Sequence, residues 1–69
     1  MPYVNIQIVE DENTIEKKRA LVRGVTQVIV DVLGRRPDGT YIIIAEVPAE
    51  NWGIGYTTIA DRRADGAGQ

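Results

Sequence analysis

The sequence predicts an α/β fold (α+β in some classification schemes) built on one β-α-β unit, with a short hairpin near the C-terminal end. Three stretches carry this prediction: an alternating apolar pattern over 2–10, a helical apolar stripe over 14–33, and an apolar run over 40–47. Such a unit is almost always right-handed, and its two strands are parallel. The chain has only 69 residues, so we expect one domain over 1–63 and a disordered tail over 64–69.

The first expected strand, 2–10, alternates between two faces. One face carries Val4, Ile6 and Ile8, and the other carries Tyr3, Asn5, Gln7 and Val9. Because successive side chains of a strand point to opposite faces, this pattern is typical of a half-buried strand.

The expected helix, 14–33, has a start signal, an apolar stripe and a stop signal. Asn13, with Glu16 three residues later, has the form of an N-cap and its reciprocal partner. The stripe consists of seven residues at helical spacing: Leu21, Val22, Val25, Val28, Ile29, Val32 and Leu33. Gly34 stands where a left-handed C-cap belongs, and Pro37 prevents continuation.

The second expected strand, 40–47, contains the unbroken apolar run 41–45, which is typical of a strand covered on both faces. One helix covers only one face. A chain this short buries only about 60% of its unfolded surface. We therefore expect the other face to pack against a second subunit. The following segment, 51–56, has two glycines that flank an apolar residue and suits a turn or short hairpin.

Composition excludes several function classes. With no histidine and no cysteine, the chain cannot form a Ser-His-Asp triad, a Cys-His pair or a His/Cys zinc site. Eight basic and ten acidic side chains leave a net charge of -2, so we expect no nucleic-acid partner. We also expect no membrane segment and no signal peptide, because the apolar runs are strand-sized; a cytoplasmic location follows as the default.

The remaining candidate for acid–base chemistry is the N-terminus. Removal of Met1, which is favoured before a small residue, would expose the secondary amine of Pro2. A free α-amino group titrates near about 7.7–8.0, and an apolar pocket lowers that pKa toward the working pH of a general base. The alternative is a proline without function at a strand start, where proline is tolerated.

The whole pattern resembles the 4-oxalocrotonate tautomerase family over about residues 2–60: a strand that begins with proline, one amphipathic helix, a second strand closing in Glu46, and the run Trp52-Gly53-Ile54-Gly55. The resemblance implies a tautomerase-like fold that assembles as a homohexamer, or failing that a dimer. It also implies cofactor-independent proton transfer in a small enol or keto acid, with Pro2 as general base and Trp52 as a hydrophobic wall near it.

The chain departs from the family pattern at two places. Many members carry an arginine in the loop after the first strand, where this chain has 11–13 (Asp-Glu-Asn), and another at the position of Tyr41. Those arginines bind substrate carboxylates, so we expect a monoanionic or largely apolar substrate. Tyr41 could donate a hydrogen bond to a developing enolate, or it could pack with its hydroxyl in water.

Arg35 and Arg36 are further candidates for substrate binding. Parallel strands start at the same end of a sheet, so the loop 35–37 should lie near Pro2. Arginine binds carboxylates in bidentate fashion. Alternatively, the pair is solvated near the helix C-terminus, where cations interact favourably with the dipole. Trp52 could likewise be an interface anchor, which is compatible with its role as a wall. The acidic segment 10–12 is read as a solvated turn rather than a metal site.

Two alternatives to the tautomerase hypothesis remain at this point. One is a non-catalytic oligomeric scaffold or binding module with the same fold. The other is a related hydratase, dehalogenase or decarboxylase that uses the same terminal amine. The sequence leaves the natural substrate open.

Overall fold

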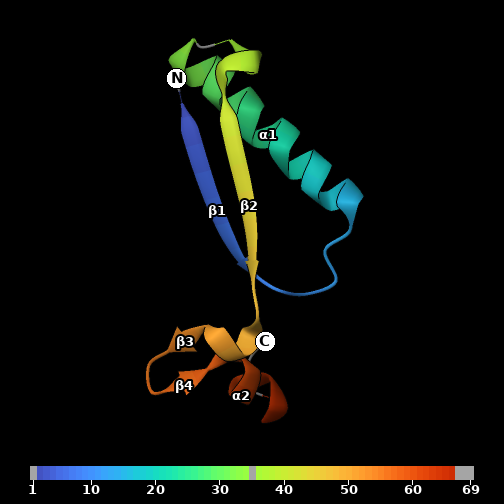
Figure 1. The fold of residues 1–69 in the computed structure, drawn as a ribbon, viewed down its shortest axis with the longest axis vertical. Coiled ribbons are helices and arrows are strands. Elements are labelled where there is room, and N and C mark those ends of the chain that lie inside the picture. The colour runs from blue at the N-terminus through green and yellow to red at the C-terminus, as the bar shows by residue number, and fades with distance from the viewer. Residues whose placement is uncertain (1, 35, 67–69) are drawn as a thin grey trace.

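Figure 1 shows the computed structural model, which describes residues 2–34 and 36–66. Met1, Arg35 and residues 67–69 lie outside the described residues. The elements are β1 (Tyr3–Val9), α1 (Ile15–Leu33), the 3-10 helix η1 (Pro37–Gly39), β2 (Tyr41–Val47), the 3-10 helix η2 (Ala49–Asn51), β3 (Gly53–Ile54), β4 (Thr57–Thr58) and α2 (Ile59–Ala64). The predicted β-α-β unit with a short C-terminal hairpin is confirmed.

The strands β1 and β2 form a parallel ladder of seven residues each. Its register runs from Tyr3 opposite Tyr41 to Val9 opposite Val47. At the starting end, the Tyr41 N–H donates to the Pro2 carbonyl oxygen at 3.0 Å. The ladder therefore holds the backbone of Pro2 beside the first residue of β2.

Figure 1 shows helix α1 on one face of the sheet, and the even-numbered side chains of β1 are half-buried, whereas Tyr3, Asn5 and Gln7 are exposed. On the helix, Leu21, Val25 and Ile29 are half-buried. An ion pair between Lys18 of α1 and Glu46 of β2 lies at the other end of the same layer. This layer, between α1 and the sheet, contains half-buried apolar side chains from both elements.

The opposite face of the sheet is open. Tyr41 and Ile43 are each 52% exposed, so the chain by itself covers β2 on one face only. The predicted helical stripe is also divided, because Val22, Val28, Val32 and Leu33 are exposed. Packing of α1 at an angle to the sheet leaves the flanks of a wide stripe without partners.

The chain by itself does not enclose a core. Within 2–34 and 36–66, no side chain is buried. The accessible surface is 5325 Å², against about 4,300 Å² for a compact monomer of this size. The radius of gyration is 15.4 Å, against about 11 Å for a compact domain of 69 residues.

The caps of α1 agree with prediction at one end only. Gly34 adopts the left-handed conformation, with φ of 67°, and its N–H donates to the Val30 carbonyl at 3.0 Å, as predicted. The N-cap is Thr14 instead of Asn13: the Thr14 hydroxyl accepts from the Lys17 N–H at 3.2 Å. Asn13 is held in the preceding turn, because its N–H donates to the Asp11 carbonyl. No helix in the described ranges is long and apolar enough to cross a membrane.

The C-terminal unit, residues 49–66, consists of η2, the β3–β4 hairpin and α2. Figure 1 shows it beyond the carboxyl ends of β1 and β2. Helix α2 was not predicted from the sequence, although Thr58 caps it by accepting a hydrogen bond from the Asp61 N–H at 3.1 Å. Helix α2 includes Ala64, the first residue of the expected tail, and a turn follows at 65–66.

Candidate active site

Pro2 is half-buried at the start of β1. Its carbonyl oxygen accepts a hydrogen bond from the Tyr41 N–H, which fixes it beside β2. Once Met1 is removed, the amine would stand one residue before a regular parallel ladder. A base in this position has a restricted orientation, which general-base catalysis requires.

Tyr41 lies next to Pro2 on the neighbouring strand. Tyr3 is its register partner, so the two phenol side chains share the open face of the sheet. They are 59% and 52% exposed for Tyr3 and Tyr41, respectively. Pro2 and Tyr41 are therefore neighbours within one chain, and the Tyr41 side chain remains available to a ligand or a second copy.

Arg36 lies in the loop at the same end, where it caps η1. Its guanidinium is 3.3 Å from the Asp38 carboxylate, and the two side chains are 86% and 74% exposed. An ion pair this exposed contributes at most about 1 kcal/mol and leaves the arginine free to exchange partners. Arg35, the other candidate in this loop, lies outside the described residues.

Trp52 lies at the opposite end of the sheet. It lines a shallow hollow of about 240 Å³ with Gln7, Val47, Asn51 and Gly53. The seven-residue strands between this hollow and Pro2 span roughly 20 Å, at about 3.3 Å per residue. Within one chain, Trp52 therefore does not form the wall of the Pro2 site that the family resemblance implied.

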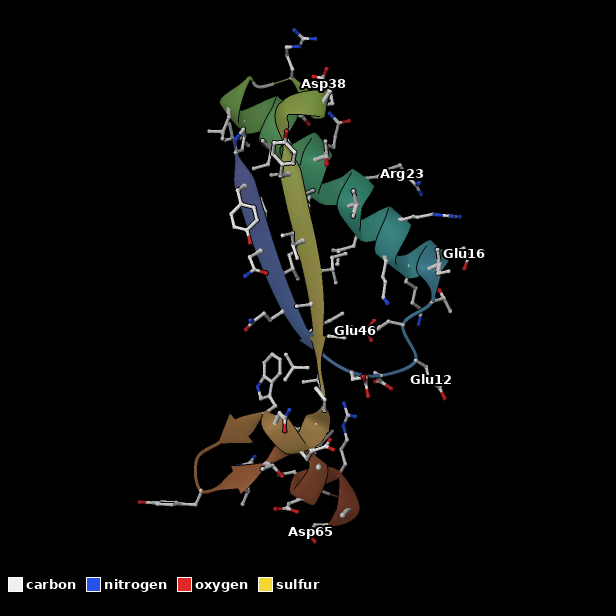
Figure 2. All side chains as sticks on the ribbon, in the orientation of Figure 1. Glu12, Glu16, Arg23, Asp38, Glu46 and Asp65 are labelled. Carbon is white, nitrogen blue, oxygen red and sulfur yellow. The ribbon has the colours of Figure 1, made fainter. Side chains whose placement is uncertain are left out.

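The end of the sheet near Trp52 also carries an ion pair that was not predicted from the sequence. Lys18 of α1 pairs with Glu46 of β2, and Figure 2 labels Glu46 near the carboxyl end of β2. The hydrogen bond and the charge of Lys18, with a smaller contribution from Asn13, lower the pKa of Glu46 despite partial desolvation. No local motif predicts this pair, because it depends on how α1 docks on the sheet.

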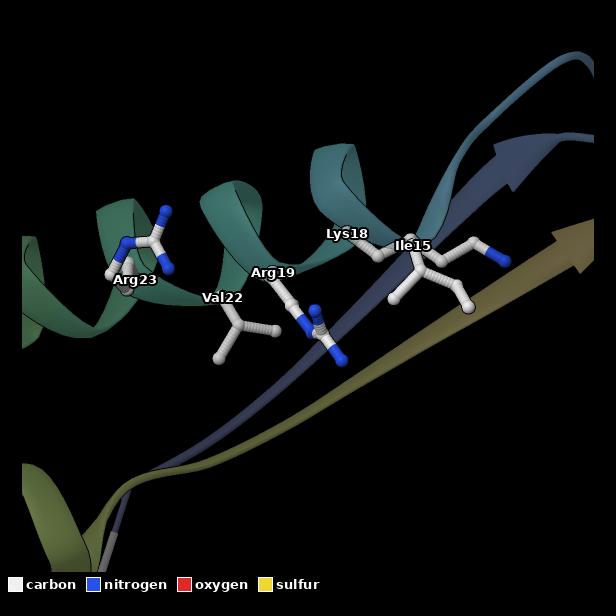
Figure 3. A pocket seen from close by; sticks show the side chains of 5 residues that line it. All are labelled: Ile15, Lys18, Arg19, Val22 and Arg23. Atoms are coloured by element: carbon white, nitrogen blue, oxygen red, sulfur yellow. The ribbon is translucent and has the colours of Figure 1, made fainter.

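A second hollow, of about 390 Å³, lies along α1 (Figure 3). Ile15 and Val22 form its apolar floor, and Lys18, Arg19 and Arg23 line it as well. These residues belong to the N-terminal half of α1, so this hollow is separate from Pro2, which lies near the other end of the sheet.

The family of this chain follows from comparison with known proteins. A model of the tautomerase family, described as tautomerase enzyme, matches residues 2–62. The chain belongs to the tautomerase family. The probable tautomerase K2 of Dickeya dadantii is 51% identical over 63 residues, covering 91% of this chain and 94% of that protein. The 2-hydroxymuconate tautomerase of Pseudomonas putida is 37% identical over 54 residues, covering 78% and 84%.

Solved structures give the same result. A 4-oxalocrotonate tautomerase isozyme from Methylibium petroleiphilum matches with a TM-score of 0.87 at 33% identity, covering 93% of this chain and 98% of that one. The DmpI protein of Helicobacter pylori matches with a TM-score of 0.84 at 32% identity, covering 91% and 97%. This tautomerase family member is therefore an isomerase with a tautomerase-type activity.

Proposed function

We propose that this chain, after removal of Met1, is a cofactor-independent tautomerase that moves a proton within a small enol or keto acid. Pro2 is the general base. It takes a proton from the carbon next to the carbonyl, or from the enol oxygen, and returns it at another atom. The single observation that carries the proposal is the position of Pro2, at the start of a strand whose ladder fixes its carbonyl beside Tyr41.

We propose that Tyr41 and the arginines of the 35–36 loop act on the substrate at this end of the sheet. The phenol of Tyr41 is a neutral donor for the oxygen on which negative charge develops. The exposed guanidinium of Arg36 attracts the carboxylate of the substrate, and Arg35, its neighbour in sequence, adds a second positive charge. Because Tyr41 replaces a cation, the site should favour a monoanionic substrate over a dicarboxylate.

We further propose that the chain self-associates, as a hexamer or failing that a dimer, and that Trp52 of one copy forms the apolar wall beside Pro2 of another. The open sheet face, the excess surface and the lack of buried side chains in the described ranges support association. The separation of Trp52 from Pro2 along the sheet supports a site shared between copies. An indole near the amine would disfavour the charged form and lower the pKa of the Pro2 amine.

The test is to remove the secondary amine in two ways. Keto–enol exchange of phenylenolpyruvate is followed for the processed parent, for processed Pro2→Ala, and for protein that retains Met1, each identified by intact mass. A general base contributes about 10²–10⁴-fold, so both altered proteins should lose activity by that order while keeping their circular dichroism spectra. Full turnover by processed Pro2→Ala protein would refute the role of Pro2.

A further inference from the structure

Arg62 is an arginine whose side chain the hairpin holds in place. It lies in α2 and is half-buried. Its Nε–H donates to the Thr57 hydroxyl oxygen at 3.0 Å, and that hydroxyl donates to the Ile54 carbonyl at 3.2 Å. Because the contact uses Nε, the two terminal nitrogens of the guanidinium remain able to bind an anion.

Arg62 differs from three other cationic side chains of the chain, because those three contact carboxylates. Lys18, Arg36 and Arg63 each pair with one, the last with Asp11 at 3.8 Å. Within the described part of the chain, Arg62 takes part in no such pair. A partly desolvated guanidinium without an anion is unfavourable, and a bidentate carboxylate would compensate for that loss of hydration.

Arg62 and Trp52 both belong to the C-terminal unit. The Ile59 N–H, at the start of α2, donates to the Trp52 carbonyl at 2.9 Å. The next residue of the hairpin, Gly53, pairs with Thr58, the N-cap of α2. The backbone of α2, which carries Arg62, is therefore fixed next to Trp52, so the two residues approach a partner together.

We infer that Arg62 binds the carboxylate of the substrate, acting together with Trp52 of its own chain on a site whose base belongs to another copy. This inference rests on the proposed function and deepens it. It supplies a cation to a site in which Tyr41 and the 11–13 loop provide none. The ligand class is a small acid with an apolar body, whose carboxylate contacts Arg62 and whose apolar part contacts Trp52.

The experiment uses binding, so it does not depend on turnover. Trp52 is the only tryptophan of the chain, so its fluorescence reports on the C-terminal unit alone. The full-length protein is titrated with 3-phenylpropanoate, an unreactive acid, and in parallel with its methyl ester. Loss of a charge-assisted hydrogen bond should weaken acid binding by Arg62→Gln about ten- to a hundredfold, with little change for the ester.

Arg63→Gln is the matched control, because it removes the same charge from the next residue of α2; acid binding should stay within about twofold of the parent, as expected for an exposed pair. Thr57→Val keeps the charge of Arg62 but removes its anchor, and should give an intermediate loss. Equal losses for acid and ester, or equal effects of Arg62→Gln and Arg63→Gln, would overturn the inference. If Arg62→Gln does not fold, a Thr57→Val protein that binds the acid as the parent does would overturn it.

The same titration on processed Pro2→Ala protein separates this inference from the proposed function. If Pro2 is not the base, processed Pro2→Ala protein retains turnover. Arg62→Gln should still bind the acid more weakly than the parent, because that binding does not depend on the base. If Pro2 is the base but Arg62 does not bind the carboxylate, turnover is lost in Pro2→Ala while acid binding stays unchanged in Arg62→Gln.

Discussion

The β-α-β unit and the C-terminal unit are built with different amounts of regular structure. The first has a ladder of seven residues on each strand and a helix of 19 residues. The second has strands of two residues and a helix of six. The long ladder orients Pro2 and Tyr41, whereas the C-terminal unit carries Trp52 at the end of η2 and Arg62 in α2. Pro2 and Tyr41, with Arg36 nearby, therefore belong to one unit, and Trp52 and Arg62 belong to the other, which one chain keeps far apart.

The largest effect is expected when the two units are supplied by different chains. Homomers of Pro2→Ala and of Trp52→Ala should each be strongly impaired. After mixed refolding in equal amounts, about a quarter of shared sites in a symmetric oligomer would combine an intact Pro2 with an intact Trp52. Phenylenolpyruvate exchange should then return to about that fraction of the parent rate.

Light scattering is the control for the mixing experiment, because both variants must keep the oligomeric state of the parent. If mixed oligomers of the parent's size show no recovery of phenylenolpyruvate exchange, Pro2 and Trp52 do not form one site across two copies. A stable folded monomer at micromolar concentration would contradict the association itself.

A smaller effect is expected for the phenol beside Pro2. Tyr41→Phe removes one neutral hydrogen bond to the developing enolate, which is worth about 0.5–1.5 kcal/mol and therefore up to about tenfold in kcat. KM should change little, because the bond strengthens as charge develops. Tyr56→Phe is the matched control, since Tyr56 is fully exposed at the hairpin turn. Equal kcat values for the two variants would assign Tyr41 to packing.

Substitution of Arg36, the exposed arginine of the first unit, should have a smaller effect than substitution of Arg62, the half-buried arginine of the second. Arg36→Ala should lower kcat/KM for phenylenolpyruvate by no more than about fivefold, because exposed ion pairs contribute about 0.2–1 kcal/mol. The loss should shrink at high salt, which screens exposed charges. Arg23→Ala, on the exposed side of α1, is the control. A salt-independent loss as large as that of Arg62→Gln would reverse the ranking of the two arginines.

The smallest effect is expected for the stability of the protein in acid, through the ion pair of Lys18 and Glu46 near the junction of the two units. Lys18 lowers the pKa of Glu46 below its ordinary value of 4.5, so the pair stabilises the fold above that value. This contribution is lost as the pH falls through the lowered pKa in the folded protein. The thermal midpoint of the parent should therefore fall more between pH 7 and about pH 3.5 than that of Glu46→Gln. Glu50→Gln, in η2, should follow the parent; parallel curves for all three proteins would show that the pair does not contribute.

Much of the β-α-β unit was predictable because its determinants are local. Alternation over 2–10, the apolar stripe of α1 and the left-handed Gly34 each depend on residues close in sequence. The parallel rule then places Pro2 beside Tyr41 without further information, since parallel strands begin at the same end. The sequence also contained a signal for α2 that we did not use: Thr58 three residues before Asp61.

Other features depend on how distant segments dock. The sequence alone determined the type and order of the main elements, the absence of histidine and cysteine chemistry, and the position of a potential terminal base. Only the tertiary structure decided that Lys18 meets Glu46 and that Arg63 lies near Asp11. The physical reason is range: helix caps and strand alternation are set within a few residues, whereas the docking of α1 and the direction of the hairpin after Pro48 depend on packing across the whole chain.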